Sequence, residues 1–256
     1  MSRDAVEIAP GVHVMTSRRY ATTSTVVIAG DEALVIDPCW DADELAGVAA
    51  FLTTAATRCA AGLATHLHYD HVLWHPDLGG VPRWSSAWAA DQWAVDRAAL
   101  IQPLLGDIPD DLVDLAGHVT PVPPAGLPWR GREVILHEHD AHARGHLAVE
   151  IVDASVLIAG DMLSDVELPY PDADAPDLTS YLEGLDSLAQ IVQRSRVLVP
   201  GHGTPTYSPI ERLDADRRYL DTVLTGRPID DPRLADPDNQ DLHARTLEQA
   251  RATRLH

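Results

Sequence analysis

The sequence predicts an α/β protein whose two halves repeat one pattern of elements. Short runs of β-branched and other apolar residues, bounded by turn-forming residues, alternate with longer segments whose apolar residues have helical spacing. Each half contains strands, a loop rich in metal-binding side chains and a helix that would cover them. The chain has 256 residues, of which 45% are hydrophobic and 23% charged. These values are ordinary for a globular protein with a sizeable core.

The first half begins with two predicted strands, 24–30 (STVVIAG) and 33–38 (ALVIDP), joined by a turn-like Gly-Asp-Glu sequence that is typical of a hairpin. Residues 41–56 start with acidic capping candidates and carry apolar residues at helical spacing, which predicts a helix. The short apolar stretch 62–66 is a further predicted strand. The sequence HLHYDH (66–71) follows at its carboxyl end, where ligand-binding loops lie in sheets covered by helices.

Residues 84–128 differ from this pattern and are interpreted as a helical insertion. Trp84, Trp88 and Trp93 favour a helix at about 85–100, and the remainder is rich in Pro, Asp and Leu. Such an insertion would wall a pocket. The alternative is that the three tryptophans belong to the core.

The second half repeats the first loosely and ends in a polar tail. We expect strands at 132–139, 147–153, 156–161 and 196–203, with the second and third forming a hairpin, and helices at 177–193 and 208–224. Residues 1–227 are therefore predicted to form one domain. Residues 228–256 are a polar, Pro-rich extension with a possible helix at 241–254.

Charge and composition restrict the partners. The formal net charge is −20, and all 19 basic residues are arginine. Such a field repels nucleic acid and anionic membranes, so a small-molecule substrate is favoured, and the oligomeric state stays open. No run of ~18 apolar residues predicts a membrane span, and the first fifteen residues lack the apolar segment of a secretory signal. Cys39 and Cys59 are too few for a disulfide framework, so we expect a cytoplasmic protein with reduced cysteines.

Metal-binding side chains recur at the ends of the predicted strands. They lie in HLHYDH (66–71), AHARGH (141–146), AGD (159–161) and PGHG (200–203). Imidazole and carboxylate suit Zn²⁺, with Fe or Mn possible. His66 and His68 are two apart, so both can point the same way from an extended loop. Asp70 and His71 can then turn toward a second position, so this one loop could serve two neighbouring metals.

On these residues the chain resembles the metallo-β-lactamase superfamily over roughly residues 10 to 205. Its HxHxDH motif is matched by His66, His68, Asp70 and His71, its later Asp by Asp161, its last His by His202, and its strand ending in Asp by Asp37. The resemblance implies a four-layer αββα sandwich, with two mixed β-sheets packed face to face, helices outside and the metals at one edge. It also identifies 1–227 as a hydrolase domain of this kind.

The resemblance leaves two histidines for one further ligand position. The family pattern is His-x-x-Gly followed by Ser or His, with the first His as ligand. This register selects His142 and places His146 in the trailing position, next to the ligands. Ala141 stands where the family usually has Gly, so His146 remains the alternative.

The resemblance implies two divalent metal ions, expected to be Zn²⁺ with Fe or Mn possible. One would be held by His66, His68 and His142, the other by Asp70, His71 and His202, with Asp161 bridging. A water shared by two such metals loses a proton near neutral pH and becomes the nucleophile. Asp70 would orient this hydroxide and later move a proton to the leaving group.

Two further residues are candidates for supporting roles. Asp37 is expected to orient a ligand histidine through a hydrogen bond, the alternative being that it caps the helix that follows. Tyr170 lies in a Pro-flanked loop after Asp161 and is a candidate proton donor. Tyr181 falls in a helical pattern and is expected to pack in the core.

The implied activity is hydrolysis of an ester-type bond: a thioester, a lactone or another ester. An acyl-homoserine-lactone-type lactonase remains open, since such enzymes share the HxHxDH motif and a tyrosine after the bridging Asp. A β-lactamase is less favoured because those enzymes generally lack a bridging aspartate such as Asp161. A catalytically silent metal-binding module is less favoured because all seven ligands are present. The stretch 72–78 separates the motif from the glycines that usually follow it, which makes Trp74 and His75 candidates for substrate contact, the alternative being a solvated loop.

Overall fold

The β-branched runs of the first half pair into a seven-stranded mixed sheet in the computed structural model, which describes residues 4–173 and 175–253. Its strand order follows the sequence: β1 (Val6–Ala9), β2 (Val12–Thr16), β3 (Thr23–Ala29), β4 (Glu32–Ile36), β5 (Arg58–Leu63), β6 (Arg83–Ser85) and β7 (Thr120–Pro121). The first four strands are antiparallel and the last three run parallel to β4. The predicted hairpin at 24–38 is confirmed as β3–β4.

The second half forms a four-stranded mixed sheet in the order β11-β10-β9-β8. Its strands are β8 (Val134–His139), β9 (His146–Ile151), β10 (Val156–Ile158) and β11 (Val197–Val199). The predicted hairpin of the second half is confirmed as the antiparallel pair β9–β10, and β11 pairs in parallel with β10.

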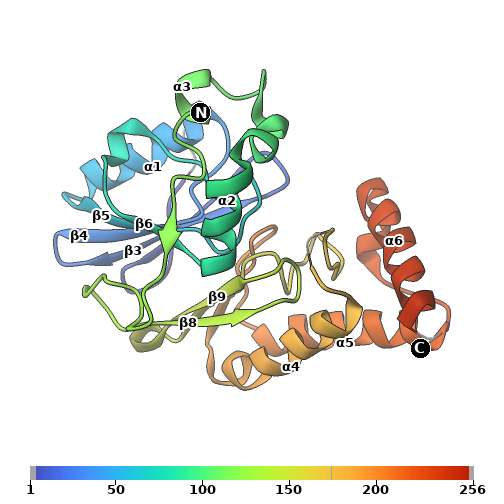
Figure 1. Cartoon of the computed structure of the whole chain (residues 1–256). Helices are drawn as coiled ribbons and strands as arrows, with labels where there is room; N and C mark the ends of the chain where they lie inside the picture. The colour runs from blue at the N-terminus through green and yellow to red at the C-terminus, as the bar shows by residue number, and fades with distance from the viewer. Residues whose placement is uncertain (1–3, 174, 254–256) are drawn as a thin grey trace.

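The two sheets pack face to face because strand residues alternate between opposite faces. Leu34 and Ile36 of β4 belong to a cluster shared with Val149 and Ile151 of the other sheet. Their neighbour Val35 faces the other way and packs with the helix on that side. Figure 1 shows the resulting layers, with helices on the outer side of each sheet. The αββα sandwich is therefore confirmed.

Five helices lie near their predicted positions: α1 (Ala42–Thr54), α2 (Ala87–Leu100), α4 (Leu178–Arg194), α5 (Pro209–Thr225) and α6 (Pro237–Thr253). The short helix α3 (Asp110–Val113) was not predicted as a separate element. Asp41 is the N-cap of α1 and forms a capping box with Glu44, so Asp37 does not cap this helix. Tyr181 is 1% exposed in the core between α4 and the second sheet, as expected.

Residues 84–128 are not wholly helical. The segment contains α2 and α3, but β6 and β7 at its two ends extend the first sheet. Trp93 of α2 is buried, and its indole N–H donates to the Leu67 carbonyl at 2.8 Å, which supports the HLHYDH loop from behind. Trp84 is buried between the sheets, so for both residues the core alternative is correct.

The end of the chain folds back onto the second half. The helix predicted at 241–254 begins at Pro237, and its last residue, 254, lies outside the described residues, as do 1–3, 174 and 255–256. Buried Asn239 accepts the Leu168 N–H at 3.1 Å and donates to the Val166 carbonyl at 2.6 Å. None of the helices in the described part of the chain is both long enough and apolar enough to cross a membrane. Cys39 and Cys59 do not form a disulfide.

A buried cation joins this C-terminal segment to the loop after β10. Arg233 donates to the carboxylates of Asp216 at 2.7 Å and Asp231 at 2.8 Å. It also donates to the carbonyls of Ser164 at 3.0 Å and Glu167 at 2.9 Å. Arg233 is 8% exposed and Asp216 is 1% exposed, so neither charge can find water as a substitute partner.

Arg233→Ala is therefore expected to lower the free energy of unfolding by about 3–5 kcal/mol, because Asp216 is left as an unpaired buried charge. The control is Arg217→Ala, which breaks an exposed ion pair with Asp186 and should cost at most about 1 kcal/mol. Urea unfolding followed by circular dichroism measures both. If both variants lowered the free energy of unfolding by the same small amount, the stabilising role of Arg233 would be contradicted.

Candidate metal centre

Four loops bring the predicted metal ligands to one edge of the two sheets. HLHYDH follows β5, the loop with His142 follows β8, Asp161 follows β10 and His202 follows β11. The strand predicted at 62–66 ends at Leu63, so His66 already stands in the loop. Polar residues placed after neighbouring strands therefore converge although they are up to 136 residues apart in sequence (202 − 66).

The first group of ligand atoms is made of three imidazoles and one carboxylate. Nδ1 of His68 lies 2.9 Å from Nε2 of His66 and 3.2 Å from Nε2 of His142. Oδ2 of Asp161 lies 3.4 Å from Nε2 of His66 and 3.5 Å from Nε2 of His142. Three ring nitrogens and a carboxylate oxygen thus face a common centre.

The second group adjoins the first through the same aspartate. Oδ2 of Asp70 lies 3.3 Å from Nε2 of His202 and 3.5 Å from Nε2 of His71. Asp161 approaches Nε2 of His71 with Oδ1 at 3.1 Å and Nε2 of His202 with Oδ2 at 3.3 Å. Asp161 therefore lies between the two groups, in the place that the family resemblance implied for a bridging residue.

Two buried atoms in this cluster indicate what the cluster can hold. Nε2 of His71 and Oδ1 of Asp161 are buried and lie 3.1 Å from each other, and neither has a hydrogen-bond partner among the other described residues. Buried polar atoms are nearly always paired, so their lack of a hydrogen bond needs an explanation. Imidazole nitrogen and carboxylate oxygen are ligand atoms that Zn²⁺ prefers. The residues present therefore fit a pair of divalent cations.

The charges in the cluster also favour the binding of cations. Burial by itself would lower the pKa of His71, but the carboxylates of Asp161 and Asp70 outweigh it and raise that pKa well above its ordinary value. The pKa of His202 is likewise raised well above its ordinary value by Asp161, against the effect of burial. Burial lowers the pKa of His66 well below its ordinary value, so His66 is neutral, as a ligand must be. The carboxylates of the cluster thus favour positive charge at these two imidazoles, which divalent cations would supply.

Asp37 orients one of the histidines. Its Oδ2 accepts the Nδ1–H of His71 at 2.9 Å, which leaves Nε2 of His71 facing the cluster. Asp37 also accepts the backbone N–H of Thr65 at 2.8 Å and its hydroxyl at 2.6 Å, so the carboxylate is itself fixed. This is the contact expected of a residue that positions a metal ligand.

Backbone groups hold two other histidines. The Nδ1–H of His142 donates to the Tyr170 carbonyl and that of His202 to the Tyr20 carbonyl, each at 3.0 Å. Beside His202, a Cβ on Gly201 would lie 1.9 Å from Oδ1 of Asp161. Only glycine therefore lets the PGHG loop pass this close to the central aspartate.

The geometry separates His142 from His146. Nε2 of His142 faces the first group, whereas Nε2 of His146 accepts the backbone N–H of Asp161 at 3.2 Å. The His146 ring is stacked between those of His66 and His139, with centroids 4.9 and 4.8 Å away. His146 thus supports Asp161 from behind, and the arrangement agrees with the register that selects His142.

The cluster opens into a cavity of about 430 Å³. Six predicted site residues line it: His68, Asp70, His142, Asp161, Tyr170 and His202. The remaining wall comes from residues that the sequence did not single out: Tyr20, Tyr69, Glu167, Asp172, Asp238, Asp241, Leu242 and Arg245. The last four belong to α6, so the predicted C-terminal extension contributes to this site.

Two expectations about the pocket are wrong. The segment 84–128 does not line the cavity: α2 packs against Leu67 and Ala143 on the side of their loops away from it, and α3 packs against Leu45 of α1. Trp74 is 3% exposed and packs with the core beneath α1, and its indole N–H donates to the Gly79 carbonyl. His75 caps a short 3₁₀ turn by accepting the Asp77 N–H. Neither Trp74 nor His75 is placed to contact a substrate in this cavity.

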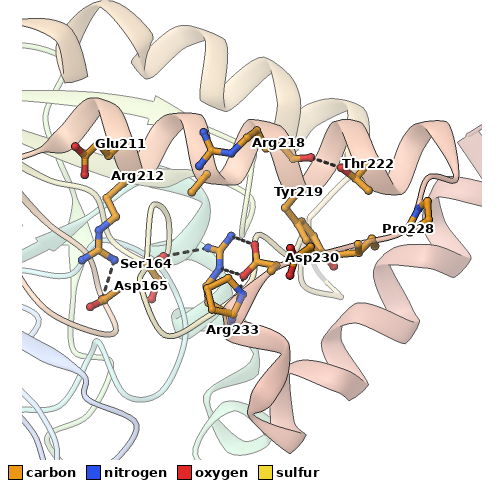
Figure 2. Close-up of a pocket in the computed structure, with 14 residues that line it drawn as sticks. Ser164, Asp165, Glu211, Arg212, Arg218, Tyr219, Thr222, Pro228, Asp230 and Arg233 are labelled. Carbon is orange, nitrogen blue, oxygen red and sulfur yellow. Dashed lines mark hydrogen bonds and ion pairs between the residues drawn. The ribbon is translucent and has the colours of Figure 1, made fainter.

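A second cavity, of about 540 Å³, lies between the Ser164–Asp165 loop, α5 and residues 228–233. Figure 2 shows two of its three arginines engaged: Arg212 pairs with Asp165 at 3.0 Å, and Arg233 makes the contacts described above. Among the described residues, no group of metal-binding side chains falls in this cavity. The chemistry therefore belongs to the smaller cavity.

Comparisons with known proteins agree with this geometry. A family model described as the metallo-beta-lactamase superfamily matches residues 18–202. The chain is similar to a metallo-β-lactamase from Pontibacter korlensis, with 18% identity and a TM-score of 0.63, over 83% of this chain and 95% of that one. It is similar to a metallo-β-lactamase family protein from Thermus thermophilus, with 21% identity and a TM-score of 0.61, over 86% and 83%. It is also similar to the metallo-β-lactamase FIM-1 from Pseudomonas aeruginosa in its mono-zinc form, with 18% identity and a TM-score of 0.63, over 85% and 96%. At these identities the solved structures establish a common fold.

Proposed function

Because the chain belongs to the metallo-β-lactamase superfamily, we propose that it is a hydrolase that uses two divalent metal ions to cleave an ester-type bond in a small molecule. The observation that carries this proposal is the position of Asp161, which lies within 3.5 Å of ring nitrogens from both groups of ligands. A carboxylate placed in this way suits a bridge between two neighbouring cations.

The proposed ligands divide as the two groups do. His66, His68 and His142 would hold one ion, Asp70, His71 and His202 the other, and Asp161 would contact both. Zn²⁺ is the proposed metal because imidazole and carboxylate suit it. When bound, such ions make a water molecule acidic near neutral pH and polarise a carbonyl group.

The chain's own residues would manage the protons. Asp70 lines the cavity, and its carboxylate can orient a water molecule and then carry a proton toward the leaving group. Burial raises the pKa of Tyr170, so its hydroxyl stays protonated near neutral pH. We propose this hydroxyl, at the cavity wall, as a donor to the leaving oxygen or sulfur. It would have to exchange its present hydrogen bond to Asp172 for one to the substrate.

The charges of the cavity support a neutral or cationic substrate. Arg245 is the one arginine among the described lining residues, and Asp238 and Asp241 stand near it on α6. An anionic thioester, such as one carried by glutathione, would meet these two carboxylates on entry. A neutral ester or lactone would not be repelled.

The proposed function is tested by metal removal and by a substrate panel. Protein freed of metal with dipicolinate is expected to lose hydrolysis of esters, thioesters and lactones by at least about a hundredfold, because the Lewis acid is gone. Two equivalents of Zn²⁺ should restore it. Hydrolysis of a β-lactam in the panel would favour the β-lactamase alternative, and hydrolysis of a homoserine lactone would favour the lactonase. Zinc binding without turnover of any member would favour the silent module.

Paired esters that differ only in charge test the substrate class. We expect kcat/KM for the neutral ester to exceed that for the anionic one by roughly tenfold at low salt, because the rim repels anions. The double variant D238N/D241N should lower the ratio of kcat/KM for the neutral ester to that for the anionic ester, and high salt should lower it too. D230N, a change in the second cavity, is the matched control. A preference for the anionic ester in the unaltered protein would contradict the proposed substrate class.

A further inference from the structure

Asp172 contacts several residues of the candidate metal site, although no pattern in the sequence singled it out. Its Oδ2 lies 2.9 Å from Nε2 of His68, and its Oδ1 accepts the hydroxyl of Tyr170 at 3.0 Å. Its backbone N–H donates to the His142 carbonyl at 2.8 Å. One residue thus contacts two proposed ligands of the first metal and the proposed proton donor.

His68 needs such a partner because it is turned differently from its neighbours. His66 and His142 present Nε2 to the first group, whereas His68 presents Nδ1. Its Nε2 therefore points away from the group and toward Asp172. A carboxylate oxygen can only accept a hydrogen bond, so this contact requires the proton to be on Nε2. Nδ1 then carries the lone pair, in the form that binds a metal.

The loop that carries Asp172 is itself anchored. Gln249 of α6 donates to the Pro171 carbonyl at 3.3 Å, and Asn239 of the same helix binds the loop at Val166 and Leu168. The Asp172 side chain is 32% exposed, so its position depends on these contacts more than on burial. The C-terminal helix thus holds Asp172 against His68.

We propose that Asp172 is a positioning residue for the first metal, fixing the ring orientation and tautomer of His68 so that Nδ1 faces the other two imidazole nitrogens. This inference rests on the proposed function. Asp172 lies outside the HxHxDH motif and is not the bridging residue, so its role is additional to theirs. A carboxylate on the outer nitrogen of a ligand histidine also raises its basicity, and the loss of such a partner typically costs 10–100-fold in metal affinity.

The first test is zinc binding by the full-length protein, measured by competition with a chromophoric chelator. The unaltered protein should bind two equivalents. In Asp172→Ala, one equivalent is expected to weaken about 10–100-fold while the other is unchanged. Asp172→Asn, which keeps an acceptor oxygen but loses the charge, should lie between them. Asp230→Asn removes one charge from the second cavity and should leave both affinities unchanged.

The second test reads the tautomer directly. In metal-free protein, ¹⁵N-correlated spectra of the imidazoles should show His68 protonated on Nε2, and a mixture of tautomers in Asp172→Ala. A purely structural role would instead weaken both zinc equivalents and lower the melting temperature, without changing the tautomer of His68 in Asp172→Ala.

The outcomes separate this inference from the proposed function. Two unchanged zinc affinities in both Asp172 variants, or His68 protonated on Nδ1 in the unaltered protein, would overturn the role of Asp172 alone. An unaltered protein that binds no zinc would overturn the proposed function itself.

Discussion

Asp161→Ala is expected to lower kcat/KM by at least about a thousandfold, or about 4 kcal/mol in transition-state free energy, and to reduce bound zinc below two equivalents. The reason is its position. Its carboxylate lies within 3.5 Å of Nε2 atoms from four histidines, and apart from Nε2 of His71 its Oδ1 has no hydrogen-bond partner among the described residues. Removing it takes a ligand from both proposed ions together.

Elemental analysis and steady-state kinetics measure the two effects on the same preparation. Asp161→Asn keeps the size of the side chain and removes the charge, so it should lose most of the activity while retaining the fold. Asp186→Ala, at an exposed ion pair far from the cavity, is the control and should bind zinc and turn over substrate normally. Two tightly bound zinc ions in Asp161→Ala, with a rate within tenfold of the unaltered protein, would show that this carboxylate is no bridge.

The second large effect is expected at His142, in contrast with its neighbour His146. Nε2 of His142 lies 3.2 Å from Nδ1 of His68 in the first group, so His142→Ala should remove one zinc equivalent and lower kcat/KM by at least about a hundredfold. His146 accepts the Asp161 N–H and binds no ion in this account, so His146→Ala should keep two equivalents and lose less activity.

The comparison needs a control for folding because His146 is completely buried, and alanine there leaves a cavity. His146→Gln can still accept the Asp161 N–H and should recover part of the lost activity. Circular dichroism and thermal unfolding identify any variant that fails to fold. Loss of zinc from His146→Ala together with full zinc in His142→Ala would reverse the assignment of the third ligand.

The strands and the central ligands were predictable because their signals are local. A β-branched run ending in a polar residue predicts a strand with a side chain at its end, and this pointed to Asp161 and His202. The role of Asp37 came from the resemblance to the superfamily. HLHYDH adds ligand types at fixed spacing. Since neighbouring strands end at one edge, local patterns sufficed to bring distant residues together.

Asp172 and α6 were not identified because no local pattern distinguishes them. Asp172 is one of several aspartates in PDADAPD (171–177), and its role follows only from the way His68 is turned. The helix α6 was expected only as part of a tail, and its contact with the cavity depends on the folding back of residues 228–236. Polar residues such as Arg233 and Asn239 are buried there, but their burial cannot be read from composition.

Trp74 and His75 were misjudged for a related reason. The stretch 72–78 follows the ligand motif directly, which suggested the mouth of the site. The chain turns away after His71, and the large apolar ring of Trp74 is buried beneath α1. Burying this ring stabilises the fold more than a position at the solvent-exposed rim of the cavity would. Nearness in sequence to a ligand is a weak guide to nearness to the substrate.

An anomalous-difference map from crystals grown with Zn²⁺ tests the central claim most directly. The account predicts two peaks, one bounded by His66, His68 and His142 and the other by Asp70, His71 and His202, with the Asp161 carboxylate between them. A map without density at that edge of the sheets, or with one ion held by other residues, would contradict it.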